Sequence, residues 1–153
     1  MVYLMLRVRK KLPHTVPQWV DPRSWFFITI NCLPRGQNHL CIAGVASCLF
    51  RSIEFNNERH VWSCRLCLLM PDHLHGIFRF CQDPGMTKSI TSWKSFTAKN
   101  GPVHWQRDFF DHRLRNEQEL EETISYILWN PVRKGLCKSP EEWPWVLRAE
   151  GIL

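Results

Sequence analysis

The sequence predicts a single α+β domain in which an antiparallel sheet packs against helices in two layers, as in ferredoxin-like folds. Its length of 153 residues, with 44% hydrophobic and 22% charged residues, is ordinary for one globular domain. Runs rich in aromatic and β-branched residues alternate with segments of helical periodicity. A Pro-Asp turn at 71–72 joins two of these runs into a hairpin, so their strands are antiparallel.

Each predicted element has its own signal. Strands are expected at 25–32, 61–70, 73–80 and 109–115, the first reading WFFITINC. The spacing of apolar residues predicts helices at 39–56, 85–99 and 116–130. Asn116 and Glu119 have the spacing of a capping box at the start of the third helix, and Pro131 follows its end. The resulting order is βαββαβα, which is typical of ferredoxin-like domains.

The charge is unevenly distributed along the chain. Residues 1–115 hold 16 Lys and Arg against 7 Asp and Glu, an excess of nine positive charges, whereas residues 116–153 carry a net charge of −3. We interpret the proline-containing, basic segment 1–24 as an N-terminal arm and residues 25–153 as the domain. A positive field of this size favours a polyanionic partner such as nucleic acid, although it could also serve only solubility.

The composition excludes several other classes of protein. The longest apolar run, 40–50, is too short to cross a membrane, and the N-terminus lacks the pattern of a secretory signal. Seven cysteines without framework spacing then indicate reduced thiols and a cytoplasmic location. Cys64 and Cys67 have CxxC spacing, but residues three apart on a regular strand point to opposite faces. We therefore expect buried structural thiols rather than a metal site.

Two histidines are the first candidates for chemistry. His73 and His75 lie two residues apart on a predicted strand, so both side chains project from one face and can hold one metal ion. The alternative is a pair of half-buried or surface histidines without a ligand role. A histidine-triad nucleotide transferase is excluded because the position of the third histidine is Ile77.

The third predicted helix supplies a second candidate pair. Its apolar stripe contains Leu120, Ile124, Ile127 and Leu128. Tyr126 and Asn130 lie off this stripe and one turn apart on a common face. They can be a surface tyrosine and a capping asparagine, or a functional pair. The only other tyrosine is Tyr3, in the arm, so a catalytic tyrosine here would be Tyr126.

Several motifs, in order, resemble the REP-associated tyrosine transposases, which belong to the IS200/IS605-like single-tyrosine transposases of the HUH class. The resemblance runs from about Trp25 to Trp145. It rests on LMPDHLH at 69–75, WKSFTA at 93–98, WQR at 105–107, FDH at 110–112, Arg115-Asn116, Tyr126-Ile127, NPVRKGL at 130–136 and WPW at 143–145. It implies an HUH endonuclease fold, with His73, His75 and Asn130 as metal ligands and Tyr126 as the nucleophile.

The resemblance also implies an activity and its partners. The expected function is metal-dependent cleavage and rejoining of single-stranded DNA at REP-like hairpins, through a 5′-phosphotyrosine intermediate, by a monomer or homodimer. By resemblance the ion is Mg²⁺ or Mn²⁺, while two imidazoles also suit Zn²⁺ or Co²⁺. A non-catalytic module that binds hairpin nucleic acid through the same fold is the alternative.

The remaining candidates concern contacts with DNA. Lys94, Arg107, Arg113 and Arg115 are candidates for binding backbone phosphates, and a solvated basic face is the alternative for each. Trp105 could stack on a base or belong to the core. Asp72, next to the histidines, could orient one of them, or could simply complete a turn.

Overall fold

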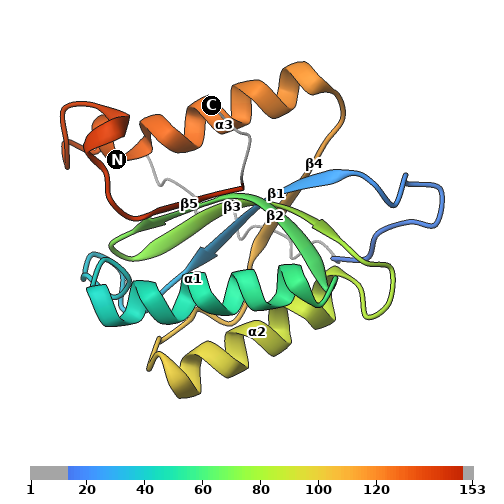
Figure 1. The fold of residues 1–153 in the computed structure, drawn as a ribbon, viewed down its shortest axis with the longest axis horizontal. Coiled ribbons are helices and arrows are strands. Elements are labelled where there is room, and N and C mark those ends of the chain that lie inside the picture. The colour runs from blue at the N-terminus through green and yellow to red at the C-terminus, as the bar shows by residue number, and fades with distance from the viewer. Residues whose placement is uncertain (1–13, 150–153) are drawn as a thin grey trace, which may run out of the picture.

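The computed structural model describes residues 14–149, in which a five-stranded antiparallel sheet is covered by helices (Figure 1). The strands are β1 (Trp25–Asn31), β2 (Trp62–Met70), β3 (His73–Phe80), β4 (Phe110–Leu114) and β5 (Val146–Arg148). The helices are α1 (Ala43–Glu58), α2 (Met86–Asn100), α3 (Glu117–Arg133) and the short 3₁₀ helix η1 (Pro140–Glu142). The strand order is β4-β1-β3-β2-β5. The α+β class is therefore confirmed.

The helices cover both faces of the sheet. Helices α1 and α2 lie on one face and α3 on the other, so the domain has three layers where the sequence suggested two (Figure 1). The second half of β2 carries a signal for this arrangement, because its residues 66–70 are all buried. A strand buried on consecutive positions needs cover on both of its faces.

Strand β5 and helix η1 were not expected from the sequence. Residues Leu66, Cys67 and Leu68 of β2 pair with β5, and Leu69 N–H donates to the carbonyl of Trp145 at 2.9 Å. A three-residue strand has too few positions to show the alternation by which strands are found. Without β5, the outer edge of β2 would expose unpaired backbone N–H and C=O groups.

Helix α3 continues through Pro131, where the sequence suggested that it would stop. Proline is compatible with helical φ and removes only one backbone donor, and this loss falls in the last turn of the helix. The Lys134 N–H donates to the carbonyl of Asn130 at 3.0 Å and closes the helix. At the other end the Asn116 side chain accepts from Glu119 N–H at 2.8 Å, as the capping box predicted.

A bulge in β2 corrects the argument about the CxxC pair. The register of β2 on β3 shifts between Cys64 and Leu66, so Cys64 and Cys67 both face the core under α1 and α2. They do not point to opposite faces, because the bulge adds one residue to the count. Both thiols are free and buried, and burial raises the pKa of Cys67 to about 12. The prediction that both thiols are buried is therefore correct, whereas the prediction that they point to opposite faces is wrong.

The part of the proposed arm that the structure describes, residues 14–24, packs against the sheet. Val20 is buried in the core, and His14 contacts the Asp111 carboxylate on β4. Residues 1–13, including Tyr3, lie outside the described residues. None of the helices within residues 14–149 combines the length and the apolar composition that crossing a membrane requires.

Candidate active site

Strand β3 brings His73 and His75 side by side on the face of the sheet that α3 covers. Their ring centroids are 4.8 Å apart. Alternation along β3 places both on the face of Ile77, which packs with Leu120 and Ile127 of α3. The register of β1 against β3 sets Asn31 opposite His73 and Thr29 opposite His75.

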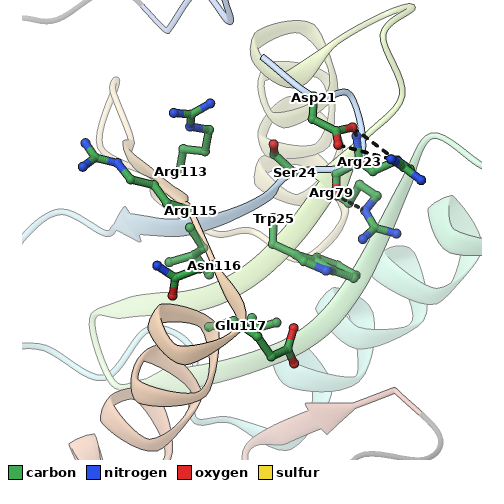
Figure 2. A pocket seen from close by; sticks show the side chains of 11 residues that line it. Asp21, Arg23, Ser24, Trp25, Arg79, Arg113, Arg115, Asn116 and Glu117 are labelled. Carbon is green, nitrogen blue, oxygen red and sulfur yellow. Dashed lines mark hydrogen bonds and ion pairs between the residues drawn. The ribbon is translucent and has the colours of Figure 1, made fainter.

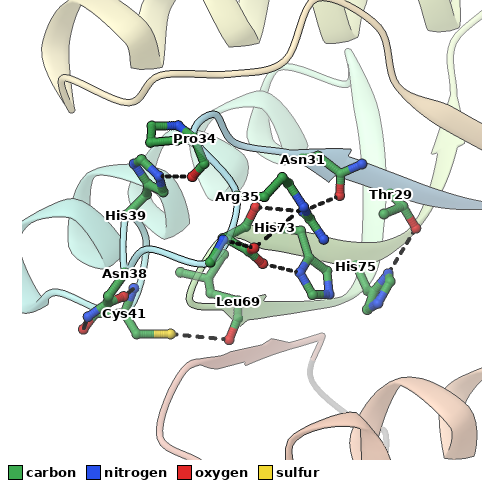
Figure 3. A network of polar contacts seen from close by, with 12 residues as sticks. Thr29, Asn31, Pro34, Arg35, Asn38, His39, Cys41, Leu69, His73 and His75 are labelled. Carbon is green, nitrogen blue, oxygen red and sulfur yellow. Dashed lines mark hydrogen bonds and ion pairs between the residues drawn. The ribbon is translucent and has the colours of Figure 1, made fainter. Parts of the chain in front are cut away.

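Each histidine is held through its Nδ1 atom (Figure 3). The Asp72 Oδ1 atom lies 2.8 Å from His73 Nδ1, and Thr29 Oγ1 lies 2.8 Å from His75 Nδ1. Neither Nε2 atom has a hydrogen-bond partner within residues 14–149. Protein partners on one ring nitrogen commonly fix the tautomer and orientation of a metal-binding histidine. The arrangement therefore leaves both Nε2 lone pairs available to a metal ion.

Asp72 is itself fixed by the segment that follows β1. Its Oδ2 accepts from the Gly36 N–H at 2.8 Å, and the Arg35 Nε lies 3.4 Å from the same oxygen. Burial raises the pKa of Asp72, but these contacts and the hydrogen bond with His73 outweigh it and hold the pKa below its ordinary value. An ionised Asp72 orients His73, which is the positioning role considered from the sequence.

Both imidazoles are held in the neutral form. Burial lowers the pKa of His73, although the Asp72 carboxylate works against this effect. Burial also lowers the pKa of His75 to about 3, assisted by its neighbour His73, with which it cannot share a second positive charge, and by the charges of Arg133 and Arg35. Neutral imidazole is the form that ligates metals. At neutral pH the pair is therefore ready to bind a cation.

Helix α3 brings Tyr126 to the histidines. The Tyr126 ring centroid lies 6.2 Å from that of His75 and 6.1 Å from that of Phe27 on β1. Its side chain is 49% exposed, and its hydroxyl makes no hydrogen bond within residues 14–149. The Arg133 guanidinium lies over the ring at 4.3 Å, and its Nη2 donates to the Tyr126 carbonyl. The ring is therefore held by Arg133 over its face and by edge contacts with Phe27 and His75, and its hydroxyl is left without a partner within residues 14–149.

Asn130 lies one turn after Tyr126 and is 4% exposed. Its burial on the helix that covers the histidines agrees with a place at the site, and its role as a ligand stays a prediction. Among residues 14–149 no group of three His, Cys, Asp or Glu side chains could hold a metal. Two imidazoles and one amide oxygen are a donor set that a divalent ion accepts when oxygens of a substrate complete its coordination.

Two candidates for DNA contact are occupied inside the protein. The Lys94 ammonium donates to the carbonyls of Gln106 and Arg107 at 2.6 and 2.8 Å, and burial lowers the pKa of Lys94. These bonds fasten α2 to the segment before β4 and leave little of the ammonium for a phosphate. Trp105 packs on Trp93 with ring centroids 5.5 Å apart, and its Nε1 donates to Thr97 Oγ1 at 2.8 Å. Both residues therefore have structural roles here.

The three arginine candidates are placed differently. Arg107 and Arg115 are exposed, and Arg113 is half-buried with its guanidinium 5.4 Å from the Trp19 ring. Arg113 and Arg115 lie together at the end of β4, which is not the end that carries the histidines. The structure thus groups these two at a second location on the domain.

Sequence reasoning missed Thr29 and Arg133, which contact His75 and Tyr126. Thr29 occupies the histidine face of β1 by simple alternation, but only the register of β1 on β3 shows that it meets His75. Arg133 follows Tyr126 by seven residues, which is two helical turns on the same face. That spacing was a usable signal for the contact.

Comparison with known proteins identifies the family of this chain. The chain is 30% identical over 131 residues to the REP-associated tyrosine transposase of Escherichia coli, a match that covers 82% of this chain and 76% of that protein. This chain belongs to the REP-associated tyrosine transposase family. A Haemophilus influenzae protein named for the same family is 37% identical over 97 residues, covering 52% of this chain and 54% of that protein. No family model matches the sequence.

The fold of the family is found among solved structures as well. A REP-associated tyrosine transposase bound to a REP hairpin superposes with a TM-score of 0.72, covering 88% of this chain and 82% of that one at 20% identity. At this identity the likeness concerns the fold. Membership of the transposase family supports an enzymatic role for the chain.

Proposed function

We propose that this transposase-family protein cleaves and rejoins single-stranded DNA at REP-like hairpins, using Tyr126 as its nucleophile. The observation that carries the proposal is the meeting of three side chains from separate elements. Two neutral histidines from β3, each held at Nδ1, lie beneath an exposed tyrosine of α3 whose hydroxyl has no partner within residues 14–149. A merely structural tyrosine has no need of this environment. Hairpin DNA as substrate is supported by the REP hairpin bound to the structural relative.

The proposed reaction is a transesterification. The Tyr126 oxygen attacks the phosphorus and its proton passes to water at the exposed hydroxyl. The bond from phosphorus to the 3′-oxygen breaks, and the leaving 3′-oxygen takes a proton from water. The products are a 5′-phosphotyrosine and a free 3′-hydroxyl. Because the phosphodiester energy is retained in the new ester, a 3′-hydroxyl can attack it and restore a DNA strand without ATP.

We assign the metal to His73, His75 and Asn130. An ion held there, Mg²⁺ or Mn²⁺, would polarise the oxygens of the scissile phosphate and align it. This assistance matters because a phenol with an ordinary pKa of about 10 is a poor nucleophile at neutral pH. The protein contributes rigid ligands, since Asp72 and Thr29 fix both imidazoles.

The test is a denaturing gel of the protein mixed with end-labelled single-stranded hairpin DNA and Mn²⁺. We expect a covalent protein-DNA band with wild type that is absent with Tyr126→Phe, whereas hairpin binding persists because only the hydroxyl is lost. Chelation or His75→Gln should also remove the band. Binding without any covalent product from wild type would refute catalysis and favour the non-catalytic hairpin-binding module.

A further inference from the structure

A cavity of about 430 Å³ lies at the end of the sheet remote from the histidines. It is bounded by the start of β1, the ends of β3 and β4, and the first turn of α3. Four arginines line it, namely Arg23, Arg79, Arg113 and Arg115; Arg79 lies beside Trp25, and the side chains of Arg113 and Arg115 point away from Trp25 (Figure 2). We call this feature the arginine groove.

Arg79 is held rigidly in the groove. Its guanidinium lies 4.2 Å from the centroid of the Trp25 ring, and its Nε donates to the Arg23 carbonyl at 2.6 Å. Its two terminal nitrogens make no hydrogen bond within the described part of the chain. A stacked guanidinium with one edge fixed presents its remaining donors in a defined direction, which suits a phosphate.

The other arginines add charge that is only partly compensated. Asp21 is hydrogen-bonded to Arg23, whereas no carboxylate forms an ion pair with Arg79, Arg113 or Arg115 within residues 14–149. The Arg113 guanidinium lies 5.4 Å from the ring of Trp19, which is 76% exposed. The groove therefore sets four arginines against two lining carboxylates, Asp21 and Glu117, and this excess of positive charge with aromatic support favours an anionic ligand.

Two independent elements set the distance from the groove to the candidate site, β3 to His75 and α3 to Tyr126. Arg79 follows His75 by four strand residues, or about 13 Å. Glu117, which lines the groove, precedes Tyr126 by nine helical residues, or about 13 Å. The Phe27 ring, on which the partly exposed rings of Phe110 and Tyr126 both pack, lies opposite Ile77, midway between His75 and Arg79 along β3. A stacked DNA strand advances about 3.4 Å per nucleotide, so this separation corresponds to about four nucleotides.

From these observations we infer that the arginine groove binds a backbone phosphate of the strand that Tyr126 cleaves, about four nucleotides from the scissile phosphate. This inference rests on the proposed function, since it takes the same DNA strand as ligand. The groove would fix the register of the strand and so select which phosphate reaches Tyr126. The phosphodiester is the group recognised, so binding there is independent of base identity.

The experiment measures hairpin DNA binding by Tyr126→Phe protein, in which no cleavage disturbs the equilibrium. Single phosphates of the strand are replaced one at a time by neutral methylphosphonate. We expect one position, about four nucleotides from the cleavage point, to weaken binding about tenfold. Adding Arg79→Gln should weaken binding of the natural strand by a similar factor and abolish the effect of methylphosphonate at that position, because the two changes remove the same contact.

Matched variants separate this role from a structural one. Arg59 on the far side of the domain is also exposed and lies 5.4 Å from an aromatic ring, that of Phe55. Arg59→Gln should leave the methylphosphonate pattern unchanged. Arg113→Gln tests the groove without disturbing the bond from Arg79 to Arg23, and should reduce the same positional effect.

The outcomes distinguish the two proposals. If wild type forms the covalent adduct and no methylphosphonate position depends on Arg79 or Arg113, the groove is not a phosphate site although the proposed function stands. If a position depends on these arginines while wild type forms no adduct, the groove binds DNA and the catalytic proposal fails.

Discussion

Replacing Thr29 by valine tests the support of the metal-binding pair directly. Thr29 Oγ1 lies 2.8 Å from His75 Nδ1, and His75 is only 7% exposed. In the tautomer that leaves Nε2 free for a metal, Nδ1 carries the proton and donates to Thr29. Valine has nearly the same shape as threonine but cannot accept this bond. A buried donor left without a partner costs about 1–3 kcal/mol, so we expect the free energy of unfolding to fall by that amount.

The metal affinity of the site should fall by a comparable free energy. Loss of a partner that orients a histidine ligand commonly weakens metal binding by about 10- to 100-fold. Urea denaturation at pH 7 measures the first effect, and Mn²⁺ titration in the presence of hairpin DNA measures the second. Thr29→Ser keeps the hydroxyl and should stay near wild type in metal affinity. Valine and wild-type proteins with equal Mn²⁺ affinity would refute the idea that Thr29 positions His75.

Three other predictions concern stability. Burial depresses the pKa of His75 from 6.5 to about 3, so the free energy of unfolding should fall as the pH drops from 6.5 toward 3, by about 1.4 kcal/mol per pH unit. Urea denaturation of His75→Gln at the same pH values should lack this fall. Lys94→Met should lower the free energy of unfolding by about 1–3 kcal/mol and leave the salt dependence of hairpin binding unchanged; a shallower salt slope would restore Lys94 as a phosphate contact. A Cβ on Gly76 would lie 2.3 Å from the buried Phe78 ring, so Gly76→Ala should cost about 1–3 kcal/mol, and an unchanged melting temperature would show that the ring can move aside.

The sequence predicted the main elements because each has a strong local signal. Seven of the nine elements found within residues 14–149 correspond to expected ones, in the expected order. The capping pair Asn116 and Glu119 placed the start of α3 correctly, because a cap is a contact between residues three apart. The end of α3 was missed because Pro131 was interpreted as a stop, whereas a proline in a last turn removes a single hydrogen bond. The layer arrangement depends on which face each helix covers, and local signals do not contain that information.

For the candidate site, the sequence likewise predicted the placement of single residues but not the contacts between segments. Alternation placed His73 and His75 on one face, and helical periodicity placed Tyr126 off the apolar stripe, but only family resemblance joined the two segments. The residues that contact them, such as Thr29, are determined by which positions of neighbouring strands lie opposite each other. Thr29 is 46 residues from His75 in sequence, and nothing in its neighbourhood marks it out. The bonds of Lys94 were equally hidden, since a basic residue in a basic chain gives no sign that backbone carbonyls will accept from its ammonium. Its contact with DNA stays a prediction.

The charges around the histidines indicate how metal and substrate depend on each other. The two imidazoles are neutral, and the positive charges of Arg133 and Arg35 act on His75, as that of Lys134 acts on His73. Cationic side chains oppose the approach of a bare divalent ion but favour a phosphate. A DNA phosphate in the site offsets this repulsion and also supplies the oxygens that Mg²⁺ and Mn²⁺ prefer. Metal and DNA should therefore bind more tightly together than either binds alone, and by linkage each must raise the affinity for the other by the same factor.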